Sequence, residues 1–332
     1  MDVKLKKLAV DVAKGQSVGN YSYDDMHEAF RTQMANLVCD EQGKIDYYKW
    51  EENSKKIFAL MGEMADVILP ARVTPVLGKF ADFKAVGDGD KPRFYLKKGK
   101  KNVKRFVTKV AAAGVYERVR LDRDYFDVEV YAHGGAVYQT LEGFLAGREN
   151  ITEVLDILLE GLEDEMYSDL TTALEGTFSE LPDANKATGS AFSASEMDKV
   201  VATVAAYGTP TIFCTREFAS TIKPEDGFVA DADKNDMRER GYIGKYKGTP
   251  IVLLPQSFTD ETNTQKVINP KNAYVMPSGA NGENPVKVVL EGQTKIRQMD
   301  REDWSLEIQL YKKMGLAITN TNHYGIVTNT SL

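Results

Sequence analysis

The stretch KPRFYLKKGKKNVKRFVTKVAAAGVY occupies residues 91–116 and concentrates positive charge. It holds nine basic residues and no acidic one, which leaves 33 basic against 49 acidic residues in the rest of the chain. Phe94, Tyr95 and Phe106 are interleaved with the lysines. Such a segment favours contact with a surface of opposite charge. Its basic residues are Lys91, Arg93, Lys97, Lys98, Lys100, Lys101, Lys104, Arg105 and Lys109.

Sequences that favour turns and strands flank this basic run. A turn-rich GDGD at 87–90 precedes it, and YFDVEVY at 125–131 follows it and is rich in β-formers. We therefore interpret residues 80–131 as a long two-stranded hairpin with a flexible tip near Gly99. Two arms of about 20 residues would reach roughly 60 Å. Because an isolated two-stranded ribbon is marginally stable in water, the hairpin requires external support.

The stretch ENITEVLDILLEGLEDEMYSDLTTALEGTF at 149–178 has the opposite bias, with nine acidic residues and no basic one. Apolar residues recur every three or four positions from Ile151 to Ala173, which predicts an amphipathic helix over 150–176. Its length would be about 40 Å. The acidic residues proposed to make contacts on it are Glu153, Asp156, Glu160, Glu163, Asp164 and Asp169.

Two interpretations of this charge segregation stay open at the level of sequence. The basic run and the acidic helix are each solvated, or they meet, within one subunit or between subunits. Because aromatic residues alternate with lysines, a hairpin that binds single-stranded nucleic acid is a further alternative.

Helices dominate the predicted N-terminal part of the chain. A helix over 24–39 has Asp24 or Asp25 as its cap, and a second helix over 46–68 ends at Pro70. The first 20 residues have no clear partner surface, so we expect a flexible or docking arm there.

Helices and strands alternate from about residue 193, and the C-terminal part is rich in strands. The segments KPEDG, DADKND and DETNT are expected to be loops. Helices are expected at 193–208, with Ser193 or Ser195 as cap, and at 215–222; strands are expected at 211–214, 251–255, 273–277, 286–290, 304–311 and 322–329.

Composition excludes several classes of protein. A chain of 332 residues suggests about two domains, and no run of about 18 uncharged apolar residues is present to cross a membrane. The N-terminus lacks an apolar core long enough for a secretory signal. With only Cys39 and Cys214 there is no disulfide framework, and a net charge of -7 argues against a protein that coats nucleic acid.

Motifs for catalysis or for cofactors are incomplete. The GDGDKP at 87–92 lacks the third glycine of a dinucleotide loop, and the His133-Gly134-Gly135 sequence lacks a GxSxG serine, which favours a hinge between strand and helix. Cys39, on a helix face, and Cys214, at a strand end, are interpreted as small buried hydrophobic residues. The pairs Asp122/Asp124 and Asp231/Asp233 are interpreted as solvated loop residues. We expect no enzyme, no cofactor and no metal site.

The order of segments resembles that of the HK97-like major capsid proteins of tailed bacteriophages. An N-terminal arm, a charged hairpin, a long acidic helix and an α/β insertion follow one another. The stretch RGYIGKYKGTPIVLLPQ at 240–256 is similar to the family's glycine-rich turn before a central strand. The ending NAYVMPSG…NPVKVVLEGQT…DWSLEIQLYKKMGLAITNTNHYGIV at 272–327 resembles its closing strands. The resemblance extends from about residue 45 to residue 330.

The resemblance implies an α+β HK97-like fold with four parts. These would be an N-terminal arm (1–45), a peripheral domain (46–85, 132–192 and 285–332) with a spine helix at 149–178, an extended loop (86–131), and an axial domain (193–284). In this family the extended loop lies over a neighbouring subunit, so the acidic helix is the expected support for the basic loop. The family's covalent link between subunits is not carried over, because no motif singles out a lysine or an acceptor asparagine.

The function implied by the resemblance is structural. Pentamers and hexamers of the chain would close into an icosahedral shell around double-stranded DNA, without sequence-specific DNA binding and without a membrane. We expect assembly in the host cytoplasm, a place in the virion, a separate scaffolding protein and a portal. The alternatives are an encapsulin-like nanocompartment, the single-strand nucleic-acid-binding module and a hydrolase using His133.

Overall fold

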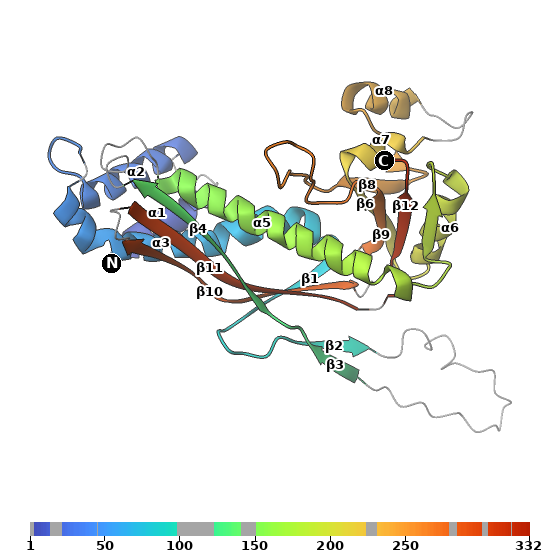
Figure 1. The fold of residues 1–332 in the computed structure, drawn as a ribbon, viewed down its shortest axis with the longest axis horizontal. Coiled ribbons are helices and arrows are strands. Elements are labelled where there is room, and N and C mark those ends of the chain that lie inside the picture. Colours follow the sequence, from blue (N-terminus) through green and yellow to red (C-terminus); the bar gives the residue numbers. More distant parts are fainter. Residues whose placement is uncertain are drawn as a thin grey trace.

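Two β-sheets organise the chain, and a two-stranded ribbon projects from them (Figure 1). Long helices cross the four-stranded sheet, and shorter helices surround the six-stranded sheet at the other end of the molecule. The computed structural model describes residues 3–13, 22–44, 46–97, 123–140, 151–223, 231–278, 284–300, 305–319 and 321–332.

The four-stranded sheet has the order β1-β10-β11-β4. Strand β1 runs parallel to β10, and the other pairs are antiparallel. Helices α3 and α5 cover one face, where Ile308 and Leu310 of the sheet pack with Leu158 and Leu162 in a single apolar core. The bounds are β1 Ala81–Val86, β4 Tyr131–Thr140, β10 Val286–Asp300, β11 Ser305–Ile318, α3 Tyr47–Leu77 and α5 Ile151–Gly176.

The six-stranded sheet has the order β5-β12-β9-β6-β8-β7. Met197 and Val200 of helix α6 pack with Phe218 and Val275 in a second core beside it. The bounds are β5 Lys186–Gly189, β6 Thr209–Cys214, β7 Lys245–Tyr246, β8 Thr249–Leu253, β9 Asn272–Ser278, β12 Gly325–Asn329, α6 Ala194–Ala205, α7 Arg216–Thr221, α8 Asp231–Arg240 and a 3₁₀ turn Phe178–Glu180.

The two sheets share apolar contacts where they meet. The rings of Phe80 and Phe213 lie 4.3 Å apart between centroids, and both belong to the core under α3 and α5. At the end of α5, the amide of Asn272 donates to Glu175 over 2.7 Å. The position of the six-stranded sheet relative to α5 is therefore fixed by burial as well as by chain connection.

The N-terminal segment is a pair of helices, which corrects the expectation of an arm without a partner surface. Helices α1 (Val3–Ala13) and α2 (Tyr23–Val38) pack on α3. Ala9 and Phe30 are buried with Leu60 of α3, because the three helices each present an apolar stripe to the others.

Helix α3 continues through Pro70, so the predicted end of this helix was wrong. Proline removes one backbone donor and costs roughly 3 kcal/mol in a helix interior. Val73 and Leu77, which follow the proline, are each no more than 1% exposed, and their burial offsets that cost.

Other local expectations divide between confirmed and corrected ones. Helix α5 and the strands and helices expected after residue 193 are present, and DETNT is a loop. Ser22 caps α2, with Asp25 returning a bond to the Ser22 backbone, so neither aspartate is the cap residue. DADKND begins helix α8 instead of forming a loop. His133 lies within strand β4, not at a hinge.

Candidate functional site

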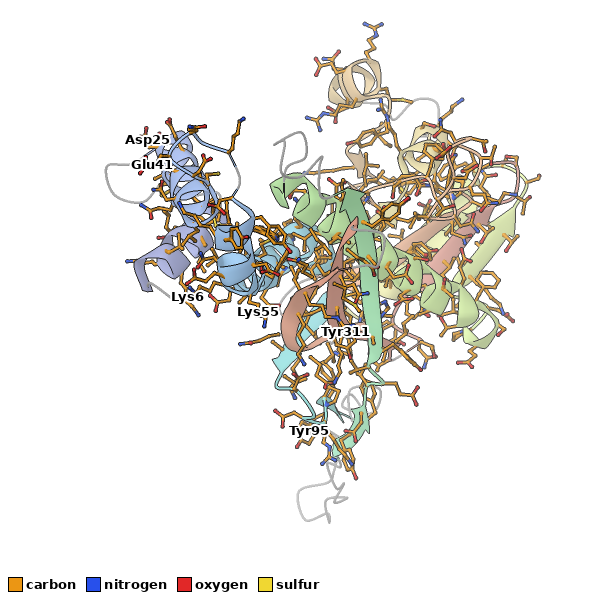
Figure 2. The ribbon with its side chains drawn as sticks, turned by 60° about the vertical axis from the view of Figure 1, so that its left-hand side comes forward. Lys6, Asp25, Glu41, Lys55, Tyr95 and Tyr311 are labelled. Carbon is orange, nitrogen blue, oxygen red and sulfur yellow. The ribbon has the colours of Figure 1, made fainter. Side chains whose placement is uncertain are left out.

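The predicted hairpin exists at its base as strands β2 (Arg93–Lys97) and β3 (Arg123–Asp127). They pair antiparallel, with Arg93 opposite Asp127 and Phe94 opposite Phe126. The expected tip at Gly99 lies outside the described residues. YFDVEVY is divided between β3 and β4 instead of forming one strand. The ribbon carries Tyr95 out beyond the sheet that holds Tyr311 (Figure 2).

Contacts with the four-stranded sheet hold the base of the ribbon. The ammonium of Lys84 donates to the carbonyl of Arg93 over 2.8 Å and lies 5.6 Å from the centre of the Phe94 ring. Lys287 lies 5.8 Å from the same ring. Cations at this range are attracted to the aromatic face. The Phe94 side of the ribbon therefore faces the molecule.

The opposite side of the ribbon is exposed. Tyr95 and Tyr125 are 66% and 58% exposed. Arg93 lies 4.2 Å from the Tyr125 ring and donates to Asp127 over 3.1 Å. The Asp127 carboxylate, which accepts this hydrogen bond, raises the pKa of Arg93. An ordered aromatic and cationic surface is thus presented to solvent or to a partner.

A close backbone approach fixes where the ribbon leaves the sheet. A Cβ at Gly315 of β11 would stand 2.4 Å from the carbonyl oxygen of Glu129. Only glycine leaves room for the chain to cross there. Val128, next to this crossing, is buried.

Only part of the basic run lies within the described residues. Lys91 is exposed before β2, and Arg93 is in the ribbon contacts given above. Lys97 is placed by its backbone, opposite Arg123. The residues of the run outside the described part are Lys98, Lys100, Lys101, Lys104, Arg105 and Lys109.

Helix α5 buries its apolar side and exposes acidic residues. Asp156 accepts from Arg72 of α3 over 2.8 Å, and Asp169 has Oδ2 3.6 Å from Nε2 of His133. Partial burial, opposed by Arg72, raises the pKa of Glu163. Glu160 is exposed and Asp164 half-buried, while Glu153 is placed by its backbone alone.

Within one chain, the described residues of the two charged segments do not meet. Arg93 pairs with Asp127 in the ribbon, and Asp156 pairs with Arg72 beside the helix. A contact between the basic run and α5 therefore stays a prediction.

Sequence reasoning did not predict a buried ion pair between the four-stranded sheet and helix α3. Lys312 is 4% exposed and donates to Asp66 over 2.7 Å. The same carboxylate accepts the backbone N–H of Thr294 over 3.0 Å. Asp66 and Lys312 are 246 residues apart, so no sequence pattern could join them.

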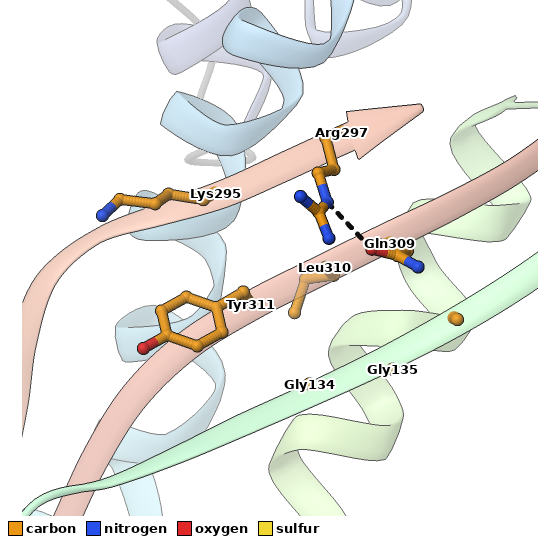
Figure 3. Close-up of a pocket in the computed structure, with 8 residues that line it drawn as sticks. Gly134, Gly135, Lys295, Arg297, Gln309, Leu310 and Tyr311 are labelled. Atoms are coloured by element: carbon orange, nitrogen blue, oxygen red, sulfur yellow. Dashed lines mark hydrogen bonds between the residues drawn. The ribbon is translucent and has the colours of Figure 1, made fainter. Parts of the chain in front are cut away.

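Sequence reasoning also did not predict a hollow on the outer face of the four-stranded sheet, the face turned away from α3 and α5. A hollow of about 480 Å³ lies there, between strands β10, β11 and β4 (Figure 3). Lys295, Arg297 and Tyr311 line one side, and Gly134 and Ala136 line the other. Arg297 is held by Gln309, to which its Nε donates over 2.8 Å.

The described residues offer little for catalysis. They hold no group of three or more His, Cys, Asp or Glu side chains that could bind a metal ion. Burial raises the pKa of the Cys214 thiol to about 12, so it is not a thiolate at neutral pH. Burial also raises the pKa of Cys39, which lies at the end of α2. No helix in the described part is long and apolar enough to cross a membrane.

Comparisons with known proteins agree with this structural picture. A sequence model of the family described as "SPbeta prophage-derived putative capsid protein YonB" matches residues 4–328. No curated protein sequence matches the chain. The mature capsid of bacteriophage PhiM1 is similar in structure, with a TM-score of 0.51 and 9% identity, over 76% of this chain and 86% of that one. The SrpI encapsulin of Synechococcus elongatus PCC 7942 has a TM-score of 0.50 and 12% identity, over 76% and 86%.

Proposed function

The chain belongs to the YonB family of prophage capsid proteins and has the HK97-like fold, and from this premise we propose that it closes through pentamers and hexamers into an icosahedral shell around double-stranded DNA. The observation that carries the proposal is the family match over residues 4–328. Closed symmetry lets one surface serve every copy and hides open edges.

The ribbon supplies the main contact between neighbouring copies in this proposal. Its outward side, with Tyr95 and Tyr125, is uncovered in the single chain, and a ribbon of this kind needs support. The acidic side of α5 on the next copy is the proposed support. Each exposed ion pair contributes only about 0–1 kcal/mol, so apolar burial drives association and charge sets the register.

The finer parts of the proposal concern domains and partners. Residues 86–131 act as the extended loop, 193–284 as the axial domain, and the segments around α5 as the peripheral domain. A scaffolding protein and a portal take part, and assembly occurs in the host cytoplasm before the shell becomes part of the virion. The net charge of -7 suits a container, since a lining that bound DNA tightly would hinder packing and release.

Electron microscopy of particles made in the native genetic context tests this function. We expect closed icosahedral shells that contain nuclease-protected double-stranded DNA. Chains that remain monomeric at all concentrations, or open sheets without closure, would contradict the proposal.

A nanocompartment that holds protein cargo is the second candidate, because the SrpI encapsulin resembles this chain about as well as the phage capsid does. The same particles separate the two functions. Shells that contain a defined protein and no protected DNA would favour the nanocompartment.

A further inference from the structure

Among the residues that the structure describes, strand β4 forms an unprotected edge of the four-stranded sheet. In the described part of the chain it pairs along its whole length with β11 and has no strand on its other side. Its ten residues, YAHGGAVYQT, include no Lys, Arg, Asp, Glu or Pro. Exposed edges in natural proteins are normally kept short or protected by charge, proline or a bulge, because an open edge pairs readily with another strand.

The other edge strands differ from β4. Strand β1, at the opposite edge of the same sheet, has six residues and carries Asp82 and Lys84. In the six-stranded sheet, β5 has four residues and β7 has two. Within the described residues, β4 is therefore the one long edge without a charge that would repel a further strand.

Both faces of the sheet are hollowed beside β4. The outer hollow of about 480 Å³ reaches Gly134 and Ala136 (Figure 3). On the inner face a second hollow, of about 410 Å³, lies between Gly134 and the Ile157 and Gly161 side of α5. Side chains of an added strand alternate between the two faces of a sheet, and the small residues Gly134, Gly135 and Ala136 leave both faces of β4 itself uncrowded.

We propose that β4 pairs antiparallel with β4 of a second copy about a two-fold axis, which joins two sheets into one. The inference deepens the proposed function, because it names a contact between copies that is separate from the ribbon. Two-fold contacts are the commonest way in which identical chains associate, and they require a self-complementary surface.

The residue sizes along β4 fit one register of this pairing. With Gly135 opposite its own counterpart, the large Tyr138 stands opposite Ala132, and Gly134 opposite Ala136. These four lie on the outer face, where Tyr138 is 76% exposed in the single chain. A large side chain opposite a small one fills the pleated surface without a clash.

The inner face is compatible with the same axis. Ile157 of α5 is 58% exposed beside β4, and a Cβ at Gly161 would meet no atom within 4 Å. Pairing would bring the two α5 helices toward each other, cover Ile157, and place Glu165 of each helix near the interface. Because both helices are acidic, added salt should strengthen this contact, since the Debye length falls from about 10 Å to about 3 Å between ~0.1 and ~1 M salt and the repulsion between the helices is screened.

A pair of cysteines tests the register on the full chain. In a Cys39→Ser background, Ala132→Cys and Tyr138→Cys are combined and oxidised, and covalent dimers are measured on a non-reducing gel. The two positions are about 20 Å apart along one strand, too far for a disulfide within one chain. We expect most chains to become dimers, and the yield to rise with salt.

Matched controls make the result decisive. Neither single variant should form dimers, and the shifted pair Ala132→Cys with Ala136→Cys should form few. Dimers from a single variant, or no dimers from the Ala132/Tyr138 pair, would overturn the pairing. A mixture of Ala132→Cys and Tyr95→Cys chains that cross-links instead would assign the edge to the neighbour's ribbon and also overturn it.

Electron microscopy of the same samples separates this inference from the proposed function. Normal shells without the cross-link would defeat the β4 pairing and leave the shell intact as a function. Cross-linked dimers that never form shells would support the β4 pairing and contradict the proposed shell function. As an independent check, Ala136→Lys added to the Ala132→Cys/Tyr138→Cys pair should abolish the cross-linked dimer while the unfolding midpoint of the subunit stays unchanged.

Discussion

At the scale of single residues, the Asp66–Lys312 pair shows how a buried charge is retained. Lys312 is almost fully covered, and its ammonium also donates to the carbonyl of Gly292 over 2.8 Å. Asp66 links helix α3 to strands β10 and β11 through this lysine and through Thr294. A buried ion pair adds little over an apolar replacement, but removal of one partner leaves an uncompensated charge.

Asp66→Asn should therefore lower the free energy of unfolding by about 3 kcal/mol, because Lys312 would stay buried without a counter-charge. Urea denaturation of the unassembled subunit measures this. Lys295→Met serves as a control, since the Lys295 side chain is 62% exposed in its pair with Asp88, and it should cost at most about 1 kcal/mol. Equal effects of the two variants would show that burial of Lys312 does not matter.

The contacts of Glu291 lead us to expect that the free energy of unfolding of the subunit depends on pH. Lys313, which donates to Glu291 over 2.8 Å, lowers the pKa of this carboxyl, with help from the N–H of Gly89. A lowered folded-state pKa means that the carboxylate stabilises the fold above its unfolded value of about 4.3 and stops doing so as pH falls through the folded value.

Glu291→Gln should thus destabilise the subunit at about pH 7 and cost progressively less below about pH 4. Unfolding midpoints of both proteins across this range provide the measurement. Glu52→Gln, on the exposed side of α3, is the matched control and should leave the midpoint unchanged. A constant gap between wild type and Glu291→Gln down to about pH 3 would refute the linkage.

At the scale of elements, one glycine in β11 and one in α5 differ in how closely other parts of the chain approach them. A Cβ at Gly315 would collide with the backbone of Glu129, whereas a Cβ at Gly161 of α5 would meet open space. Replacement of glycine by alanine is therefore expected to lower the free energy of unfolding at Gly315 and to raise it at Gly161.

Gly315→Ala should destabilise the subunit by about 1–3 kcal/mol, since the crossing chain would have to shift. Gly161→Ala should stabilise it by about 0.5–1 kcal/mol through helix propensity. Thermal unfolding of the two variants under conditions without assembly is the test. Stabilisation by Gly315→Ala would mean that the chain after the ribbon moves freely over β11.

At the scale of the whole molecule, two kinds of contact between copies should respond oppositely to salt. The proposed contact of the ribbon joins opposite charges, and the proposed β4 pairing brings like charges together. Shell formation that depends on the ribbon should weaken as salt is added, because exposed charges are screened.

Reversal of four lysines of the basic run to glutamate should leave the subunit folded and reduce shell formation in light scattering. The four are Lys97, Lys98, Lys100 and Lys101. A loss of about 1.4 kcal/mol per contact lowers the association constant about tenfold. The compensating change of Glu160 and Asp164 to lysine should restore assembly in part.

An equal change of charge elsewhere controls for net charge. The four exposed lysines for it are Lys7, Lys55, Lys56 and Lys271. Their reversal should leave shell formation near its normal level. If both sets reduce it equally, total charge and not the ribbon governs assembly.

The sequence by itself determined the features that depend on local periodicity and on the order of segments. The amphipathic pattern from Ile151 onward produced α5, and the alternation around Ile308 and Leu310 produced β11, because a regular apolar stripe must be buried whatever covers it. The order of charged hairpin, acidic helix and α/β insertion was enough to indicate a capsid family.

Only the tertiary structure decided what covers each surface. Helix α3 passes Pro70 because residues from distant strands bury its second half, and Asp66 meets Lys312 because three elements converge on one point. The open edge of β4 depends on the strand order, which no pattern within YAHGGAVYQT reveals. Local sequence fixes which side of an element is apolar, whereas the energy of burial is settled only between segments far apart in the chain.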